Sequence, residues 1–151
     1  MFVIGVSYLG WIEVRDQQKL ETIEDELHTT NRVHELVVQA KESLKEYEGE
    51  EIPTALGDMV VSTMHHTEQF YSSTLLDNGI ETGRDYILTV RYNIWDIQKI
   101  AGKAGKEASV LTAESMQEIQ DSEEQIAEVL RMLDGKRSAL ENKIENYWWR
   151  S

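Results

Sequence analysis

Apolar residues recur at helical spacing through most of the chain. From Asp16 onward they stand three and four positions apart, which places them on one face of an α-helix. Asp16 can act as the N-cap of this first helix, over about 16–48, and Gly49 as its stop, because glycine tolerates the left-handed conformation that ends many helices. The stripe consists of Leu20, Ile23, Leu27, Thr30, His34, Val37, Lys41 and Leu44.

A second run of the same spacing predicts a helix over about 53–77. Pro53 suits the first turn of a helix, where its missing N–H is not needed. Asn78-Gly79 has the composition of a turn and closes this run. The connector before it is short, so the first two helices should be antiparallel neighbours.

The third segment, about 82–101, can be interpreted in two ways. Tyr86–Tyr92 alternates between apolar and polar residues as a β-strand does. A heptad series also runs in phase from Ile87 to Leu111, and it is longer than the alternating stretch. We therefore favour a helix here, because a long in-phase series arises by chance less easily than a short alternation.

The clearest run predicts a last helix over about 107–149. Asp134-Gly135 lies inside it, because the apolar stripe crosses this dipeptide in phase. Ala101–Lys106 is rich in small residues, so it is either a patch of close helix contact or a break, since each Gly costs about 1 kcal/mol of helix propensity relative to Ala. The pattern leaves open whether the last two helices fuse into one rod.

Together these elements predict an all-α fold, an elongated antiparallel bundle of three or four helices with coiled-coil-like seams over residues 16–151. Residues 1–15 form a separate apolar segment that carries no charge before Glu13. Its alternating residues suit an extended strand or docking arm. Such a strand has no partner inside a helical bundle, so it would pair with a second copy or another sheet edge, or lie across the bundle. Membrane contact through this segment and ordinary capping of the core are the two alternatives.

Both ends of the chain are aromatic. In an up-down-up-down bundle the last helix ends beside the start of the first, so these residues should gather at one pole. Trp and Tyr dominate binding hot spots and membrane-interface belts. We predict a partner-binding pole, with a plug that closes the bundle as the alternative; its residues are Phe2, Ile4, Val6, Tyr8, Trp11, Tyr147, Trp148 and Trp149.

The composition narrows the class of protein. The 151 residues hold 15 Lys and Arg against 28 Asp and Glu, a net charge of -13, which argues against binding nucleic acid through its phosphates. Residues 13–51 hold 12 acidic and 5 basic side chains and residues 107–146 hold 10 and 4, whereas residues 52–106 hold 6 and 5. We interpret the two acidic arms as solvated outer faces around a more buried centre.

Few residues offer catalytic or metal chemistry. The chain has no Cys, which removes disulfides, thiolate zinc sites and cysteine nucleophiles. His65 and His66, with Glu68, resemble a metal cluster, but adjacent histidines point about 100° apart on a helix. His34 would face a Met-rich second helix as a haem ligand or pH sensor, although a half-buried histidine is the simpler interpretation.

No phosphate-binding loop or nucleophile elbow occurs in the sequence, so we expect no enzyme, no cofactor and no metal. We predict a non-catalytic structural or protein–protein interaction protein that self-associates or docks through its aromatic pole, as a homo-oligomer or component of a virion or other assembly. Two alternatives are an acidic inhibitor that imitates nucleic acid, and a membrane-attached helical sensor or scaffold. The apolar start is shorter than the about 20 residues that span a bilayer and has no secretory signal, so we favour a cytoplasmic or virion-associated location.

Overall fold

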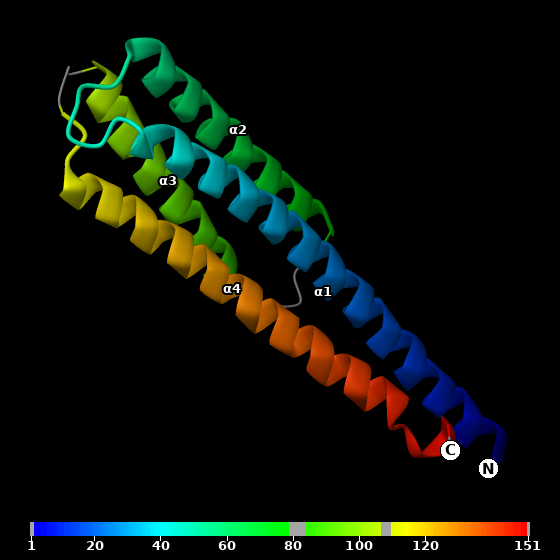
Figure 1. Cartoon of the computed structure of the whole chain (residues 1–151). Helices are drawn as coiled ribbons and strands as arrows, with labels where there is room; N and C mark the ends of the chain where they lie inside the picture. The colour runs from blue at the N-terminus through cyan, green and yellow to red at the C-terminus, as the bar shows by residue number, and fades with distance from the viewer. Residues whose placement is uncertain (1, 79–83, 107–109, 151) are drawn as a thin grey trace.

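The protein is a bundle of four antiparallel helices (Figure 1). The computed structural model describes residues 2–78, 84–106 and 110–150, except for the side chains of residues 2–4, 6, 76–78, 84 and 150. Its helices are α1 (Phe2–Lys45), α2 (Thr54–Asn78), α3 (Arg84–Lys106) and α4 (Ala113–Glu145), followed by the 3-10 turn η1 (Trp148–Arg150). The predicted all-α bundle is confirmed, and Tyr86–Tyr92 lies in α3 rather than in a strand.

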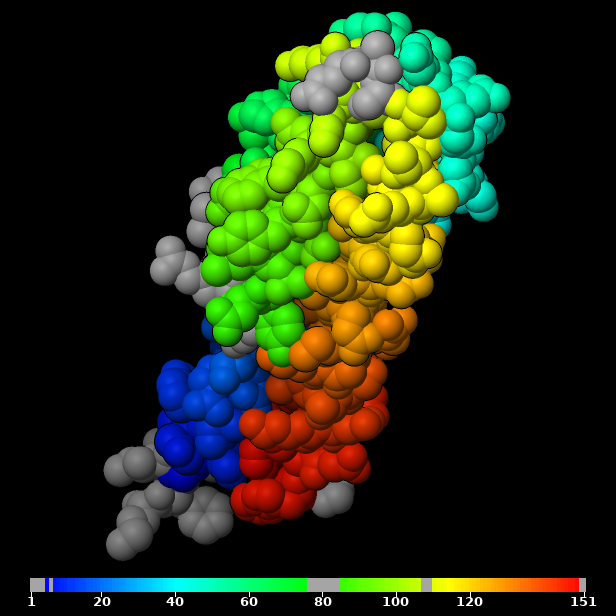
Figure 2. All heavy atoms as spheres, turned by 90° about the vertical axis from the view of Figure 1, so that its left-hand side faces the viewer, coloured from blue at the N-terminus to red at the C-terminus, as the bar shows by residue number. Residues whose placement is uncertain are grey.

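Unequal helix lengths divide the molecule into two parts. α1 and α4 have 44 and 33 residues, but α2 and α3 have only 25 and 23. The short helices therefore lie beside only one half of the α1–α4 pair, and a view from the side shows the same division (Figures 1 and 2). We call the four-helix part the body, and we call residues 2–22 and 137–150 the stalk.

The body has a continuous apolar core to which every helix contributes. α1 packs against α2 and α4, and α3 packs against the same two helices on the opposite side. The core follows the predicted spacing of three and four residues, which keeps one face of each helix inward. Its fully buried members include Val33, Val37, Leu44, Met64, Val90, Ile94, Ile97, Ile119 and Ile126.

The body is closed at the end remote from the chain termini. Gly49 has a φ of 84°, as the predicted helix stop requires. Its N–H donates to the carbonyl oxygen of Leu111 at 2.7 Å, and the N–H of Leu111 donates to the carbonyl of Glu50 at 3.0 Å. Thr112 then caps α4 by accepting a hydrogen bond from the N–H of Ser115 at 3.0 Å. The two connectors therefore hold each other in place.

Small residues allow α2 and α3 to approach closely near this closed end. A Cβ atom added at Gly57 would lie 2.9 Å from the Cα of Gly105 and 3.2 Å from the carbonyl oxygen of Ala101. Gly102 and Gly105 are both helical. Of the two interpretations of Ala101–Lys106, the contact patch is confirmed and the break is wrong.

The predicted extended segment at the N-terminus is wrong, because α1 begins at Phe2 and runs to Lys45. Asp16 is consequently no N-cap: it lies in the middle of α1 and its side chain is 1% exposed. A helix that is already formed gains one hydrogen bond for each residue it adds, whereas an isolated strand in this bundle would gain none. Nothing in the first 15 residues, such as a proline, stops that extension.

The predicted boundaries of the last two helices need correction as well. α3 and α4 are separate antiparallel neighbours and do not fuse into one rod. α3 continues to Lys106, and α4 begins at Ala113 and ends at Glu145. The predicted helix starts at 82 and 107, and the glycine of the Asn78-Gly79 turn, lie outside the described residues. α4 passes through Asp134-Gly135 without interruption, as predicted.

The α2–α3 contact leads to a first prediction. Replacement Gly57→Ala should lower the free energy of unfolding by about 1–3 kcal/mol, because the new methyl group meets backbone that cannot move aside without separating the helices. The measurement is chemical denaturation followed by circular dichroism. Gly135→Ala is the matched control: a Cβ there meets nothing within 4 Å, so it should stabilise by up to about 1 kcal/mol. Equal effects of the two substitutions would contradict this account of the contact.

Candidate functional site

The end of the stalk collects aromatic side chains from both ends of the chain. The rings of Tyr147 and Trp149 are stacked with centroids 4.2 Å apart, and Trp148 packs edge-on against Trp149 at 5.6 Å. On α1, Tyr8 and Trp11 are one helical turn apart with ring centroids at 6.1 Å. We call these five residues the stalk tip; both chain termini lie at this end of the molecule (Figure 1).

Hydrogen bonds and ion pairs fasten the C-terminal part of the stalk tip to α1. The Tyr147 hydroxyl donates to a carboxylate oxygen of Asp16, and the Lys143 ammonium lies 3.1 Å from the same oxygen. The indole N–H of Trp149 donates to the Glu13 carboxylate at 3.1 Å. A buried carboxylate needs such partners, because losing its hydration is costly. Asp16 therefore fixes where α4 ends on α1.

This attachment places the two aromatic groups differently from the prediction. Tyr147 contacts α1 at Asp16 and Trp149 contacts it at Glu13, which lie five and two residues beyond Trp11. The ring of Tyr8 contacts that of Trp11, and the Trp11 ring is covered in part by the Arg15 guanidinium, 5.1 Å from its centroid. The side chains of Phe2, Ile4 and Val6 lie outside the described residues. The predicted single aromatic pole is thus two adjoining clusters, one at the C-terminal end of α4 and one of Tyr8 and Trp11 on α1.

Burial separates the residues of the stalk tip by role. Tyr147 is 9% exposed and closes the α1–α4 seam, as the plug interpretation expected. Tyr8, Trp11 and Trp148 are 60%, 56% and 72% exposed. Large aromatic surfaces left in water at one end of a molecule mark a contact site more often than scattered apolar residues do. The exposed group is the candidate docking surface.

The arrangement of the helices explains why Tyr8 and Trp11 are uncovered. In the body, the face of α1 toward α2 carries Leu36, which lines a groove with residues of α2, and the buried Thr29. Steps of seven residues keep a side chain on one face of a supercoiled helix, so this face continues through Thr22 and Arg15 to Tyr8. Because α2 ends at Asn78, none of the described helices lies beside the same face in the stalk.

Charge is distributed unevenly between the two parts. The stalk, residues 2–22 and 137–150, contains 5 basic and 5 acidic side chains. Residues 23–136 contain 10 basic and 23 acidic ones. The excess negative charge therefore belongs to the body, and the stalk tip is the part of the surface where electrostatic repulsion between molecules is weakest.

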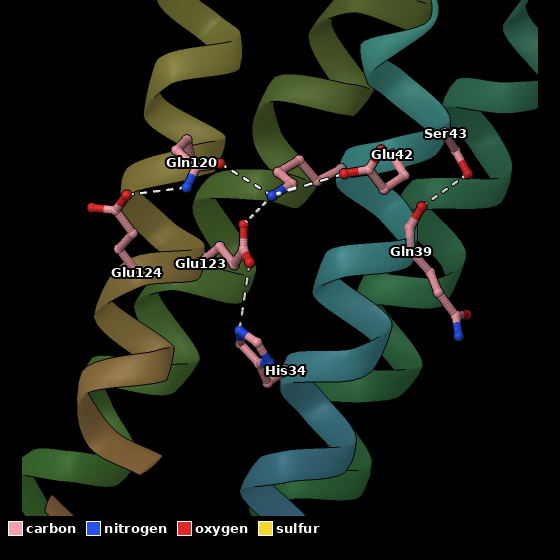
Figure 3. A network of polar contacts seen from close by, with 8 residues as sticks. His34, Gln39, Glu42, Ser43, Gln120, Glu123 and Glu124 are labelled. Atoms are coloured by element: carbon pink, nitrogen blue, oxygen red, sulfur yellow. Dashed lines mark hydrogen bonds and ion pairs between the residues drawn. The ribbon is translucent and has the colours of Figure 1, made fainter. Parts of the chain in front are cut away.

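A polar network crosses the α1–α4 seam in the body (Figure 3). The Lys41 ammonium is ion-paired with Glu123 and donates to the side-chain oxygen of Gln120 at 3.1 Å. His34 lies with its Nε2 atom 3.6 Å from the other Glu123 oxygen. His34 thus faces α4 and not the Met-rich α2, so that part of the prediction is wrong. The sequence signal that we missed is the pair of opposite charges, Lys41 and Glu123, at stripe positions of two helices.

A second polar group lies deeper, where α2 approaches its end. Tyr71 is 1% exposed and Glu26 is 2% exposed. Burial raises the pKa of Tyr71 above its ordinary value, the negative charge of Glu26 raises it further, and the polar side chain of Thr30 acts in the opposite direction. The phenol therefore stays protonated well into the alkaline range. This group had no local sequence signal, since its members come from separate helices.

The histidine pair of α2 is on the surface. His65 and His66 are both exposed, and a ring nitrogen of His66 is 2.8 Å from the carbonyl oxygen of Ser62. Among the described residues, no group of three or more His, Asp or Glu side chains is arranged to hold a metal ion. None of the helices, within the part of the chain that the structure describes, combines the length and apolarity needed to cross a membrane.

A scan against models of protein families, a search of curated proteins and a search of solved structures each return no match for this chain. Its own geometry is therefore the basis for a functional argument. The features that distinguish this bundle are the unpartnered stalk, its exposed aromatic residues and its local lack of negative charge.

The Asp16 attachment gives a second prediction. Tyr147→Phe keeps the ring but removes the hydroxyl donor to a buried carboxylate, so the free energy of unfolding should fall by about 1–3 kcal/mol. Tyr8→Phe removes a hydroxyl from an exposed ring and should change it by no more than about 0.5 kcal/mol. Denaturant titration of both variants measures the difference. If Tyr147→Phe proved as neutral as Tyr8→Phe, the hydrogen bond would not hold the stalk together.

Proposed function

We propose that this protein is a non-catalytic interaction protein: the body is a stable helical scaffold, and the stalk tip is the surface through which it docks or assembles. The observation that carries the proposal is the exposure of Tyr8, Trp11 and Trp148 together at the end of the molecule that lacks excess negative charge. A component of a virion or of another assembly would have this role. The cytoplasmic or virion-associated location expected from the sequence stays a prediction.

Aromatic side chains support this role because they contribute contact area at little entropic cost. Trp and Tyr are enriched among residues whose removal most weakens protein binding. Leaving them exposed in the free molecule sacrifices the free energy that burial would supply, which for each large apolar side chain is about 1.5–3 kcal/mol. A partner that covers them recovers this free energy.

The charge distribution supports the stalk tip as the docking surface, because it disfavours contacts through the body. Two bodies, each with 23 acidic and 10 basic side chains in residues 23–136, repel each other when they approach side by side. Contact through the stalk tips keeps the bodies apart. The acidic faces thus act against wrong contacts while the stalk tip provides the attractive one.

The polar groups of the described interior fit a structural role in this proposal. Glu123 and Lys41 are paired across the α1–α4 seam, and the Oδ2 atom of Asp16 is engaged by Tyr147 and Lys143. Groups that are paired in this way hold helices in register. We assign no reaction to them.

Solution mass tests the proposal directly. In lipid-free buffer the full chain should form oligomers of its 17.4 kDa protomer at micromolar concentration, as measured by light scattering after size exclusion. The double variant Tyr8→Ser, Trp11→Ser should shift this equilibrium toward the monomer, because it removes the exposed aromatic contact. Mean residue ellipticity should stay the same, since both side chains point into solvent.

The chain contains its own matched control. Tyr92 and Trp95 on α3 have the same spacing, are 55% and 41% exposed, and carry Arg91 over the Trp95 ring at 5.1 Å. The variant Tyr92→Ser, Trp95→Ser removes the same chemistry from the body and should leave the mass unchanged. A monomeric wild-type chain, or equal loss of mass in the two double variants, would rule out the stalk tip as the assembly surface.

A further inference from the structure

The start of α1 is apolar around most of its circumference. Successive residues of an α-helix are about 100° apart. Exposed Tyr8, Trp11 and Val14, with half-buried Leu9 and Ile12, therefore spread apolar side chains over an arc of about 220°. A helix that packs on one neighbour needs an arc of only about 100°. Surroundings that are apolar on every side suit this segment better than a single protein surface does.

The length of the uncharged part agrees with such surroundings. Phe2 is the first residue of α1 and Glu13 is the first charged residue of the chain. The helical residues between them extend for about 16 Å at 1.5 Å per residue. The hydrocarbon core of a bilayer is about 30 Å thick, so this length matches one leaflet. Residues 2–12, the described part of this uncharged segment, are by themselves too few to cross the membrane.

The residues that follow have the chemistry of a membrane interface. Trp11 is two residues before the end of the uncharged segment at Glu13, and amphipathic rings favour the headgroup region. The exposed Trp148 packs against Trp149, whose indole N–H donates to the Glu13 carboxylate. Arg15 lies against the Trp11 ring, and Lys19 is one further turn along α1. Basic side chains at this depth extend toward phosphate groups while their methylene chains stay in apolar surroundings.

The charges of the molecule favour anionic lipid and an orientation in which the body projects away from the membrane. The stalk is neutral, with 5 basic and 5 acidic side chains, so an anionic surface does not repel it and attracts the basic residues of α1 next to the tip, Arg15 and Lys19. Glu21, the next acidic residue of α1 after Asp16, lies about 15 Å beyond Trp11 along the helix, which exceeds the screening length of about 8–10 Å. The acidic body is thus far enough from the anionic membrane surface for the electrostatic repulsion between them to be small. If the molecule lay flat on the membrane, the surface would repel the body.

From these observations we infer that the partner of the stalk tip is an anionic lipid bilayer: the first three turns of α1 enter one leaflet, and the body projects from the membrane. This inference rests on the proposed function, because it names the partner of the same docking surface. The molecules then associate with one another in water because no lipid covers the exposed aromatic residues of the stalk tip.

Flotation with vesicles tests the inference. Vesicles of phosphatidylcholine containing roughly a third phosphatidylserine should carry the full chain upward in a density gradient, and pure phosphatidylcholine vesicles should carry less of it. Tyr8→Ser, Trp11→Ser should lower the partition coefficient at least about tenfold, because two large side chains no longer leave water. Tyr92→Ser, Trp95→Ser should float like the wild type.

A charge variant separates headgroup attraction from apolar insertion. Lys19→Gln should weaken binding to the phosphatidylserine vesicles by about fivefold and leave binding to pure phosphatidylcholine unchanged. Equal weakening on both vesicle types would contradict the anionic preference.

The absence of Cys allows a probe of depth at a single site. An environment-sensitive fluorophore attached through Gly10→Cys should brighten and shift to the blue when vesicles are added. The same label through Gly135→Cys should not change. Both glycines are helical and exposed, and an added Cβ meets nothing within 4 Å at either one.

The outcomes distinguish this inference from the proposal beneath it. If the tip variant abolishes self-association but the wild type does not float on either vesicle type, the partner is a second copy and the lipid inference is overturned. If the wild type neither self-associates nor floats, the stalk tip is not a docking surface and both fail. Equal flotation of the two double variants overturns the lipid inference as well.

Discussion

The seam between α1 and α4 is the contact on which the rest of the structure depends, because it alone runs through both the body and the stalk. In the body it is one of four helix contacts around an apolar core. In the stalk no other helix of the described residues contributes, and the pair is fastened by the buried carboxylate of Asp16. A pair of helices has only one buried face each, so the stalk necessarily presents more side chains to its surroundings than the body does.

Polar residues within this seam set the register of the long helices. Lys41 and Glu123 cross it in the body, and Asp16 and Tyr147 cross it 131 residues apart in the sequence near the stalk end. An apolar seam alone would tolerate a shift by one heptad, whereas a shift here would leave buried charges without partners. The position of the stalk tip relative to the end of α4 follows from that register. The uncovered turns of α1 are therefore a consequence of the pairing, and they give the molecule a distinct end.

Much of the body could be predicted from the sequence, because its information is local and periodic. The stripes of α1 and α4, the helical stop at Gly49 and the small-residue contact around Gly105 each follow from spacing or from glycine chemistry. The start of the chain could not, since a short apolar run fits a period of two nearly as well as a helical one. Asp16 has the chemistry of a cap, but its actual partners are Tyr147 and Lys143, and only the tertiary structure brings these together. The aromatic residues were identified as an end group, whereas their division into a plug and an exposed cluster depends on the helix register.

The central claim is that α1 continues as a helix well past its last covering neighbours. Backbone hydrogen exchange along α1, measured on the monomer without lipid, tests this most directly. The account predicts a gradient: slowest exchange at Val33–Leu44 in the body, intermediate exchange around Asp16–Ile23, and fastest exchange over residues 5–11, where tertiary contacts are fewest. Uniform protection from residue 5 to residue 44 would contradict it, because it would mean that the start of α1 is covered within the monomer.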